Sequence, residues 1–263
     1  PGTICCLGKI AEDMKMPEVS LYNYTMSICS MKTRLAMEEF GVDYDDKQVD
    51  IGFALENFEP DYVRLNEKAV VPTLVVGDRV VTNSYNIVLE AAKLGKVGIP
   101  ADPVENKAAL DWFQKGDQVN FQVITYGHKG VPRGDELLIA RRERAKEYAE
   151  KYPELRSIYQ AAHDRIVEHG NCAYDADTVA QAEVDLQKRL DELDAHLADK
   201  PFIAGSNYSI ADIMWTVLLA RIEMLNMTAW ISERPNLLAY YQRMKARRSF
   251  ETARVMPNWK GGI

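Results

Sequence analysis

The 263-residue sequence lacks the features that mark exported, membrane-spanning or nucleic-acid-binding proteins. It contains no apolar run as long as a membrane span, and its first residues lack the basic-then-apolar pattern of a secretory signal. Acidic residues outnumber basic ones by 39 to 32, which gives a net charge of -7. Nucleic-acid binding generally needs a basic face, so this balance argues against it. We therefore expect a soluble, cytoplasmic protein with neither nucleic-acid nor membrane partners.

Cysteine and histidine are scarce, with four residues of each. The four cysteines do not resemble a disulfide framework in a chain of this length, and they do not pair with the histidines at zinc-ligand spacing. We therefore expect no metal site. The pair Cys5 and Cys6 lies in residues 1–15, which show no strand or helix pattern. We interpret these fifteen residues as an extension outside the fold.

The native pattern opens at Met16 with alternating strands and helices. Residues 19–24 alternate as a strand does, residues 30–40 have helical spacing, and Gly41 is a typical helix stop. A second strand is predicted at 43–49, a short helix at 60–65, a hairpin at 72–82 turning on Gly77-Asp78, and a helix from Ser84 to Leu94. This order predicts an α/β thioredoxin-like domain over residues 16–97.

After a Gly- and Pro-containing linker at 95–103, the sequence predicts an all-helical domain over residues 104–263. Helices are expected at 104–123, at 136–168 with an interruption at Pro153, and at 178–197. The segment 210–225 is apolar almost all round, which is typical of a central buried helix, and a basic helix at 236–248 follows. Ser209 and Asp212 have the spacing of a capping box at the start of the central helix.

Cys29 stands between the first predicted strand and the first predicted helix. Free backbone N–H groups and the helix dipole favour negative charge there, so this thiol is expected to act as a thiolate nucleophile. Ser27 is a candidate donor to a bound thiolate, and Ser30 a candidate helix cap. The alternative is a buried structural cysteine beside a serine cap. Lys32 occupies the position of a second cysteine in a Cys-x-x-Cys pair, so a disulfide at Cys29 would need an outside thiol to reduce it.

Two further sequence features are candidate ligand-binding positions. Pro72 opens the third strand, and a cis peptide there would leave the backbone of Val71 free to bond an extended peptide; the alternative is a strand-initiating proline. Asn83 and Ser84 stand at a helix N-terminus, a natural carboxylate site, although ordinary capping explains them equally well.

Several aromatic side chains of the helical half are candidates to line an acceptor pocket, with core packing as the better interpretation of each one singly. His128, between two glycines, is the expected exception. The others are Trp112, Phe113, Phe121 and Tyr126.

Taken together, residues 24–37, 71–74, 83–84 and 209–212 resemble the glutathione S-transferases. The segment around Ser27 and Cys29 is similar to the zeta class, whose helix start reads Ser-Ser-Cys with two arginines after it. Here Ile28 replaces the middle serine, Lys32 replaces the first arginine, and Arg34 keeps the second. Within the family, the stretch from Met16 to Ile263 looks most like the bacterial enzymes that reductively dehalogenate chlorinated hydroquinones.

This resemblance implies glutathione as co-substrate, no metal, and a small chlorinated aromatic substrate. The cysteinyl part of glutathione would pair with Val71 before a cis Pro72, and its γ-glutamyl carboxylate would rest on Ser84. Asn83 replaces the usual Glu or Gln before that serine, and Ala69 and Val70 are apolar where relatives are often polar; both departures weaken the expected binding. Family members are usually homodimers.

The implied reaction has Cys29 and Ser27 as its catalytic residues. Glutathione thiolate, helped by Ser27 or Tyr24, replaces chloride on the ring, Cys29 attacks the thioether sulfur, and a second glutathione reduces the mixed disulfide. Three alternative functions are a zeta-type maleylacetoacetate cis–trans isomerase, a non-catalytic transferase-like binding protein, and a glutaredoxin-like protein oxidoreductase. The large helical domain argues against the last, because it would crowd a protein substrate.

Overall fold

The computed structural model describes residues 18–95, 107–128 and 134–256, and its first part is a small mixed sheet with helices on both faces. The strands are β1 (Val19–Asn23), β2 (Asp45–Gln48), β3 (Thr73–Val76) and β4 (Arg79–Thr82), in the order β2-β1-β3-β4. β1 is parallel to β2 and antiparallel to β3, and β4 pairs with β3 across the Gly77-Asp78 turn. The predicted thioredoxin-like order is confirmed.

Alternation along β1 explains how the sheet is covered on each side. Leu21 of β1 and Leu74 of β3 face helices α1 (Ile28–Phe40) and α3 (Ser84–Leu94) in the main core. Tyr22 points the other way, toward Tyr62 of α2 (Pro60–Leu65), which follows the short 3-10 helix η1 (Glu56–Phe58). Successive side chains of a strand point to opposite faces, so one strand serves both layers.

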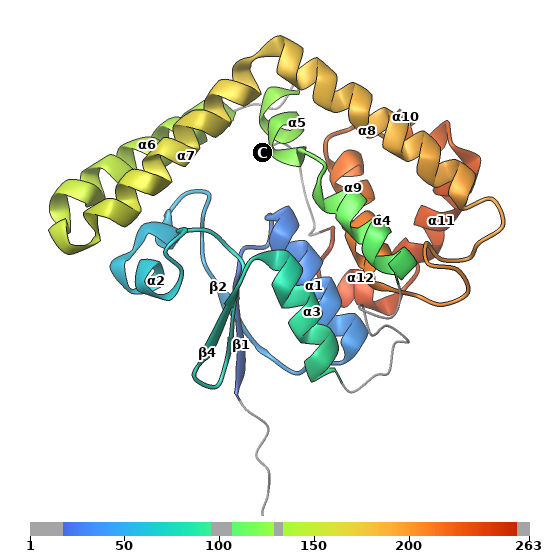
Figure 1. Cartoon of the computed structure of the whole chain (residues 1–263), viewed down its shortest axis with the longest axis horizontal. Helices are drawn as coiled ribbons and strands as arrows, with labels where there is room; N and C mark the ends of the chain where they lie inside the picture. Colours follow the sequence, from blue (N-terminus) through green and yellow to red (C-terminus); the bar gives the residue numbers. More distant parts are fainter. Residues whose placement is uncertain (1–17, 96–106, 129–133, 257–263) are drawn as a thin grey trace, which may run out of the picture.

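The remaining described elements are helical (Figure 1). They are α4 (Lys107–Asp117), α5 (Phe121–Gly127), α6 (Gly134–Lys151), η2 (Pro153–Leu155), α7 (Arg156–Tyr174), α8 (Ala176–His196), α9 (Ile210–Met224), α10 (Ala229–Ser232), α11 (Pro235–Lys245) and α12 (Arg248–Thr252). The predicted α/β unit followed by an all-α unit is therefore confirmed. No helix among the described residues is long and apolar enough to cross a membrane.

The central helix α9 is buried on nearly all sides and packs against α1 and α4. Its start carries the predicted capping box, in which Ser209 N–H and Oγ–H donate to the Asp212 carboxylate at 2.8 and 2.9 Å. Asp212 also accepts from Ile203 N–H and Tyr240 Oη, so it ties the start of α9 to two other segments. Four donors satisfy this buried carboxylate, as a buried charge requires.

Two sequence-based helix predictions were wrong in detail. The helix expected at 104–123 is broken after Asp117, and α5 begins anew with Asn120 as its cap, whose Oδ1 accepts from Val123 N–H. The basic helix expected at 236–248 ends at Lys245, and α12 follows as a separate turn. By contrast, the predicted break at Pro153 is confirmed, because η2 separates α6 from α7 there.

Helices α6 and α7 pair lengthwise and extend over the side of the sheet that carries α2 (Figure 1). Their contact with the sheet unit is a small second core, in which Tyr159 donates to the Phe58 carbonyl and Tyr148 donates to Glu59. The predicted linker at 95–103 lies, apart from Gly95, outside the described residues, as does the predicted extension 1–15. The domain boundaries at 16–97 and 104–263 stay predictions.

Candidate active site

Cys29 is the second residue of α1, and the helix begins immediately after Ser27. The Oγ of Ser27 accepts a hydrogen bond from Ser30 N–H at 3.3 Å, so Ser27 is the cap. The expectation that Ser30 caps the helix was wrong, because Ser30 is buried within α1 and its Oγ accepts from Tyr24 N–H at 3.2 Å. The thiol stands where helix N–H groups favour negative charge.

The capping bond leaves Ser27 able to act as a donor as well. A serine oxygen that accepts an N–H bond keeps its own hydroxyl hydrogen, which rotates to suit a second partner. Ser27 is therefore chemically suited to donate to a sulfur anion while it caps the helix.

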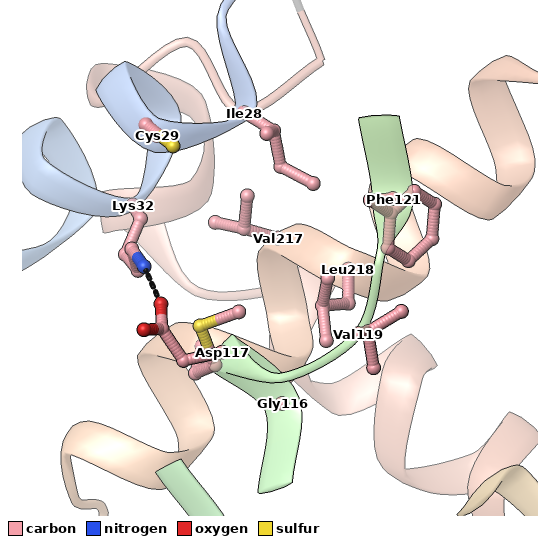
Figure 2. A pocket seen from close by; sticks show the side chains of 10 residues that line it. Ile28, Cys29, Lys32, Gly116, Asp117, Val119, Phe121, Val217 and Leu218 are labelled. Carbon is pink, nitrogen blue, oxygen red and sulfur yellow. Dashed lines mark hydrogen bonds and ion pairs between the residues drawn. The ribbon is translucent and has the colours of Figure 1, made fainter. Parts of the chain in front are cut away.

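A cavity of about 80 Å³ adjoins Cys29 between α1, the α4–α5 junction and α9 (Figure 2). Apolar side chains form most of its wall, and a charged pair closes one side. Its lining consists of Ile28, Cys29, Lys32, Gly116, Asp117, Val119, Phe121, Met214, Val217 and Leu218. An apolar enclosure with one reactive group and few polar atoms is the usual design of a small-molecule site.

The charged side of the cavity is an ion pair that the sequence did not predict. Lys32 Nζ lies 2.6 Å from Asp117 Oδ1 and 5.2 Å from the ring centre of Phe113, and Lys32 is only 3% exposed. A buried ammonium group needs such partners. The sequence comparison assigned Lys32 only the place of an arginine, and no local pattern relates it to a residue 85 positions away.

A second polar group lies beside the loop that follows β1. Tyr126 Oη accepts from Arg141 Nη1 at 3.0 Å, and Arg141 Nη2 donates to the Ile51 carbonyl at 2.8 Å. Burial raises the pKa of Tyr24, the charge of Asp50 raises it further, and Arg141 opposes the shift. Tyr24 therefore stays a protonated phenol at neutral pH, as a proton donor must.

The expected glutathione residues cluster at the start of β3 and of α3, the helix that packs against α1. The Val71–Pro72 peptide is cis, as the resemblance implied. Asn83 caps α3, with its Oδ1 accepting from Tyr85 N–H at 2.9 Å, and Ser84 is the first helical residue. The capping interpretation of Asn83 therefore holds, which leaves less of its amide for a ligand. The ligand roles of all four residues stay predictions.

The aromatic candidates do not all lie at the cavity. Phe121 lines the cavity beside Cys29, and Tyr126 belongs to the polar group near Tyr24. Trp112 and Phe113 are buried in the main core, where Trp112 packs against Trp215. His128 Nδ1 lies 3.1 Å from Glu183 Oε1, which links α5 to α8.

Within the described ranges, no cluster of three metal-ligating side chains occurs.

Comparison with known proteins agrees with this arrangement. Residues 17–89 match the N-terminal domain of the glutathione S-transferases, and residues 176–243 match their C-terminal domain. The chain is 26% identical to glutathione S-transferase TCHQD of Arabidopsis thaliana, over 92% of each chain. It is 25% identical to 2,5-dichlorohydroquinone reductive dechlorinase of Sphingobium indicum, over 93% of this chain and 84% of that protein.

Among solved structures, a theta-class glutathione S-transferase from Xanthomonas axonopodis with glutathione bound superimposes with a TM-score of 0.65. The match covers 93% of this chain and all of that one, at 23% identity, and it bears on the fold alone. The two domain matches and the thioredoxin-like sheet followed by helices agree with each other. The chain belongs to the glutathione S-transferase family.

Proposed function

We propose that this protein uses glutathione to dehalogenate chlorinated hydroquinones reductively, with Cys29 as the nucleophile of the second step. The observation that carries the proposal is the thiol at the start of α1 beside an apolar cavity. The relative named as a 2,5-dichlorohydroquinone reductive dechlorinase, which aligns over 93% of this chain, supports the substrate class.

Glutathione would bind along β3 and the start of α3. The main chain of Val71 before the cis Pro72 would pair with its cysteinyl residue, and the N–H groups and hydroxyl at Ser84 would receive its γ-glutamyl carboxylate. Asn83 would contribute mainly by holding the helix start in place, because its side chain caps the helix. In this position, the sulfur of glutathione would lie toward Ser27 and Cys29.

In the first half-reaction, glutathione thiolate adds to the ring carbon that carries chlorine, and the electron pair leaves with chloride. The hydroquinone reacts through a keto or quinone-like form, which supplies the electrophilic carbon. Ser27 donates its hydroxyl hydrogen to the thiolate, and Tyr24, a protonated phenol nearby, is the second candidate donor. The product of this step is a glutathionyl hydroquinone and HCl, with no net change of oxidation state.

In the second half-reaction, the Cys29 thiolate attacks the sulfur of the ring thioether. The carbon–sulfur bond breaks, its electron pair stays on the ring carbon, and a proton completes the hydroquinone with hydrogen in place of chlorine. Cys29 is left as a mixed disulfide with glutathione. A second glutathione thiolate reduces it and releases oxidised glutathione. Two glutathione molecules are thus oxidised for each chlorine replaced.

Product analysis tests this function. Incubation with tetrachlorohydroquinone and glutathione should yield trichlorohydroquinone and then dichlorohydroquinone, with one chloride and one oxidised glutathione for each step, by chromatography and chloride assay. A maleylacetoacetate isomerase would consume no glutathione. A non-catalytic binding protein would yield no chloride above the uncatalysed rate. Either outcome would refute the proposed reaction.

Replacing Ser84 by alanine should raise the KM for glutathione by roughly tenfold, with a smaller effect on kcat. The hydroxyl is expected to donate to a carboxylate, and hydrogen bonds to charged groups contribute about 1.5–3 kcal/mol. Initial rates at varied glutathione concentration measure the effect. Ser206→Ala, at an exposed serine in the segment before α9, is the matched control and should leave the KM unchanged. An unchanged KM in Ser84→Ala would remove Ser84 from the glutathione site.

A further inference from the structure

Arg221 of α9 is a buried cation that the proposed reaction steps do not use. It is only 5% exposed, and its Nη2 donates to the carbonyl of Met26, in the loop just before Cys29. Its Nε is buried without a hydrogen-bond partner among the described residues. A guanidinium group has five N–H donors, and the Nε–H of this one has no acceptor.

The surroundings of Arg221 also lack a fixed counter-charge. Over residues 18–95, 107–128 and 134–256, no carboxylate lies within ion-pair distance of it. Burial lowers the pKa of Arg221, and the groups that oppose the shift are Tyr126 and Cys29. An unpaired buried charge is costly unless an anion compensates it. The ionisable groups that act on this guanidinium are the thiol of Cys29, the proposed nucleophile, and the phenol of Tyr126.

The position of Arg221 on α9 relates it to the cavity beside Cys29. Val217 and Leu218 line that cavity, and Arg221 follows them by four and three residues, so all three lie on one face of the helix. Tyr126 is a second candidate to bind a ligand there. Its oxygen accepts a hydrogen bond from Arg141, and its hydroxyl hydrogen remains available to donate to a ligand. A cation and a hydroxyl donor thus stand near the reactive sulfur.

We infer that Arg221 binds a negatively charged oxygen of the acceptor substrate next to Cys29. The ligand would be a compound whose acidic ring hydroxyl binds as its oxyanion, or one that carries a carboxylate at the same position. This inference rests on the proposed function for the identity of the acceptor, since ring chlorines make the hydroxyls of a hydroquinone more acidic. Arg221 would hold that oxygen while the ring lies against the apolar wall of the cavity, which fixes the ring carbon relative to the sulfur.

Two alkylating reagents of equal size test the inference without the proposed substrate. Iodoacetate is an anion and iodoacetamide is neutral, and both alkylate a thiolate, so the ratio of their rates at Cys29 is independent of how much thiolate is present. Peptide mapping by mass spectrometry isolates Cys29 from the other cysteines. In Arg221→Gln, which keeps an N–H donor for the Met26 carbonyl, we expect the iodoacetate-to-iodoacetamide ratio to fall about tenfold.

Companion variants make this result specific. Arg221→Lys should restore much of the ratio because it restores the charge. Arg243→Met, at an exposed arginine that also donates to a backbone carbonyl, should leave the ratio unchanged. In the unmodified protein, the ratio should exceed that of free glutathione thiol by a similar factor. That comparison needs no variant, so it holds even where Arg221→Gln fails to fold.

The outcomes separate this inference from the proposed function. If both alkylation rates fell equally in Arg221→Gln, Arg221 would only stabilise the Cys29 thiolate. If neither rate changed, Arg221 would stabilise neither the thiolate nor the bound iodoacetate. Either outcome overturns the inference. Alkylation involves neither glutathione nor hydroquinone. A wild-type protein that does not dechlorinate would therefore refute the reaction proposed above, and the ratio would still decide whether an anion site exists beside Cys29.

Discussion

Replacement of Cys29 by serine should stop the release of dechlorinated hydroquinone and leave the glutathionyl hydroquinone as the accumulating product. The first half-reaction uses the sulfur of glutathione, so chloride release continues. The second needs a thiolate that attacks the ring thioether, and a serine hydroxyl is a far weaker nucleophile toward sulfur. We expect the rate of trichlorohydroquinone formation to fall on the order of 10³-fold or more.

Chromatography of the products, with chloride measured in parallel, checks this expectation. Chloride release close to that of the wild-type enzyme, together with a new thioether peak, is the expected pattern. Cys172→Ser is the matched control, because Cys172 is a partly buried thiol near the end of α7 and has no part in the proposed reaction. Ordinary yields of trichlorohydroquinone from Cys29→Ser would show that another group attacks the thioether.

Most of the fold follows from patterns within single segments. The Gly77-Asp78 hairpin, the break at Pro153 and the capping box of Ser209 and Asp212 are all local signals, and the structure confirms each of them. The helix over 104–123 was mispredicted for a local reason as well. Its apolar spacing continues past Asp117, but Asn120 forms a new cap that ends one helix and starts the next.

The candidate site was predictable only where neighbours in sequence form it. Cys29 lies at its helix start as predicted, but the identity of the cap was not, since Ser27 and Ser30 both suit the position and only the backbone decides between them. Asp117 and Arg221 lie near Cys29 in the structure although they are far from it in the sequence. No periodicity links such positions, so the cavity wall and its charges emerge only from the tertiary structure.

Arg34 shows how a single side chain fixes that tertiary arrangement. It is completely buried in α1, and it donates five hydrogen bonds to oxygens of two other segments. Three of these bonds reach the turn between β1 and α1, at Asn23 Oδ1, the Tyr24 carbonyl and the Thr25 carbonyl. The other two reach the carbonyls of residues 253 and 254 after α12. The loop before Cys29 is thereby tied to the last described turn of the chain.

Replacing Arg34 by methionine should lower the free energy of unfolding by about 3–5 kcal/mol, because it leaves several buried oxygens without donors. Arg34→Lys should recover only part of this loss. Burial lowers the pKa of Arg34 to about 10, so the native side chain is a cation at neutral pH, but a lysine ammonium cannot reproduce the planar five-donor geometry. Urea unfolding followed by tryptophan fluorescence measures the change for both variants.

Arg64→Met is the control for the loss of an arginine as such. Arg64 is exposed on α2 and pairs with Asp61 and Glu154, which are also exposed, so its loss should change the unfolding free energy by about 1 kcal/mol or less. If Arg34→Met were as stable as this control, the hydrogen bonds of Arg34 would not hold the loop.

The same bonds place the backbone that precedes Cys29, so Arg34→Lys should also slow Cys29 alkylation by neutral iodoacetamide. Lost stability with unchanged alkylation would show that α1 alone positions the thiol.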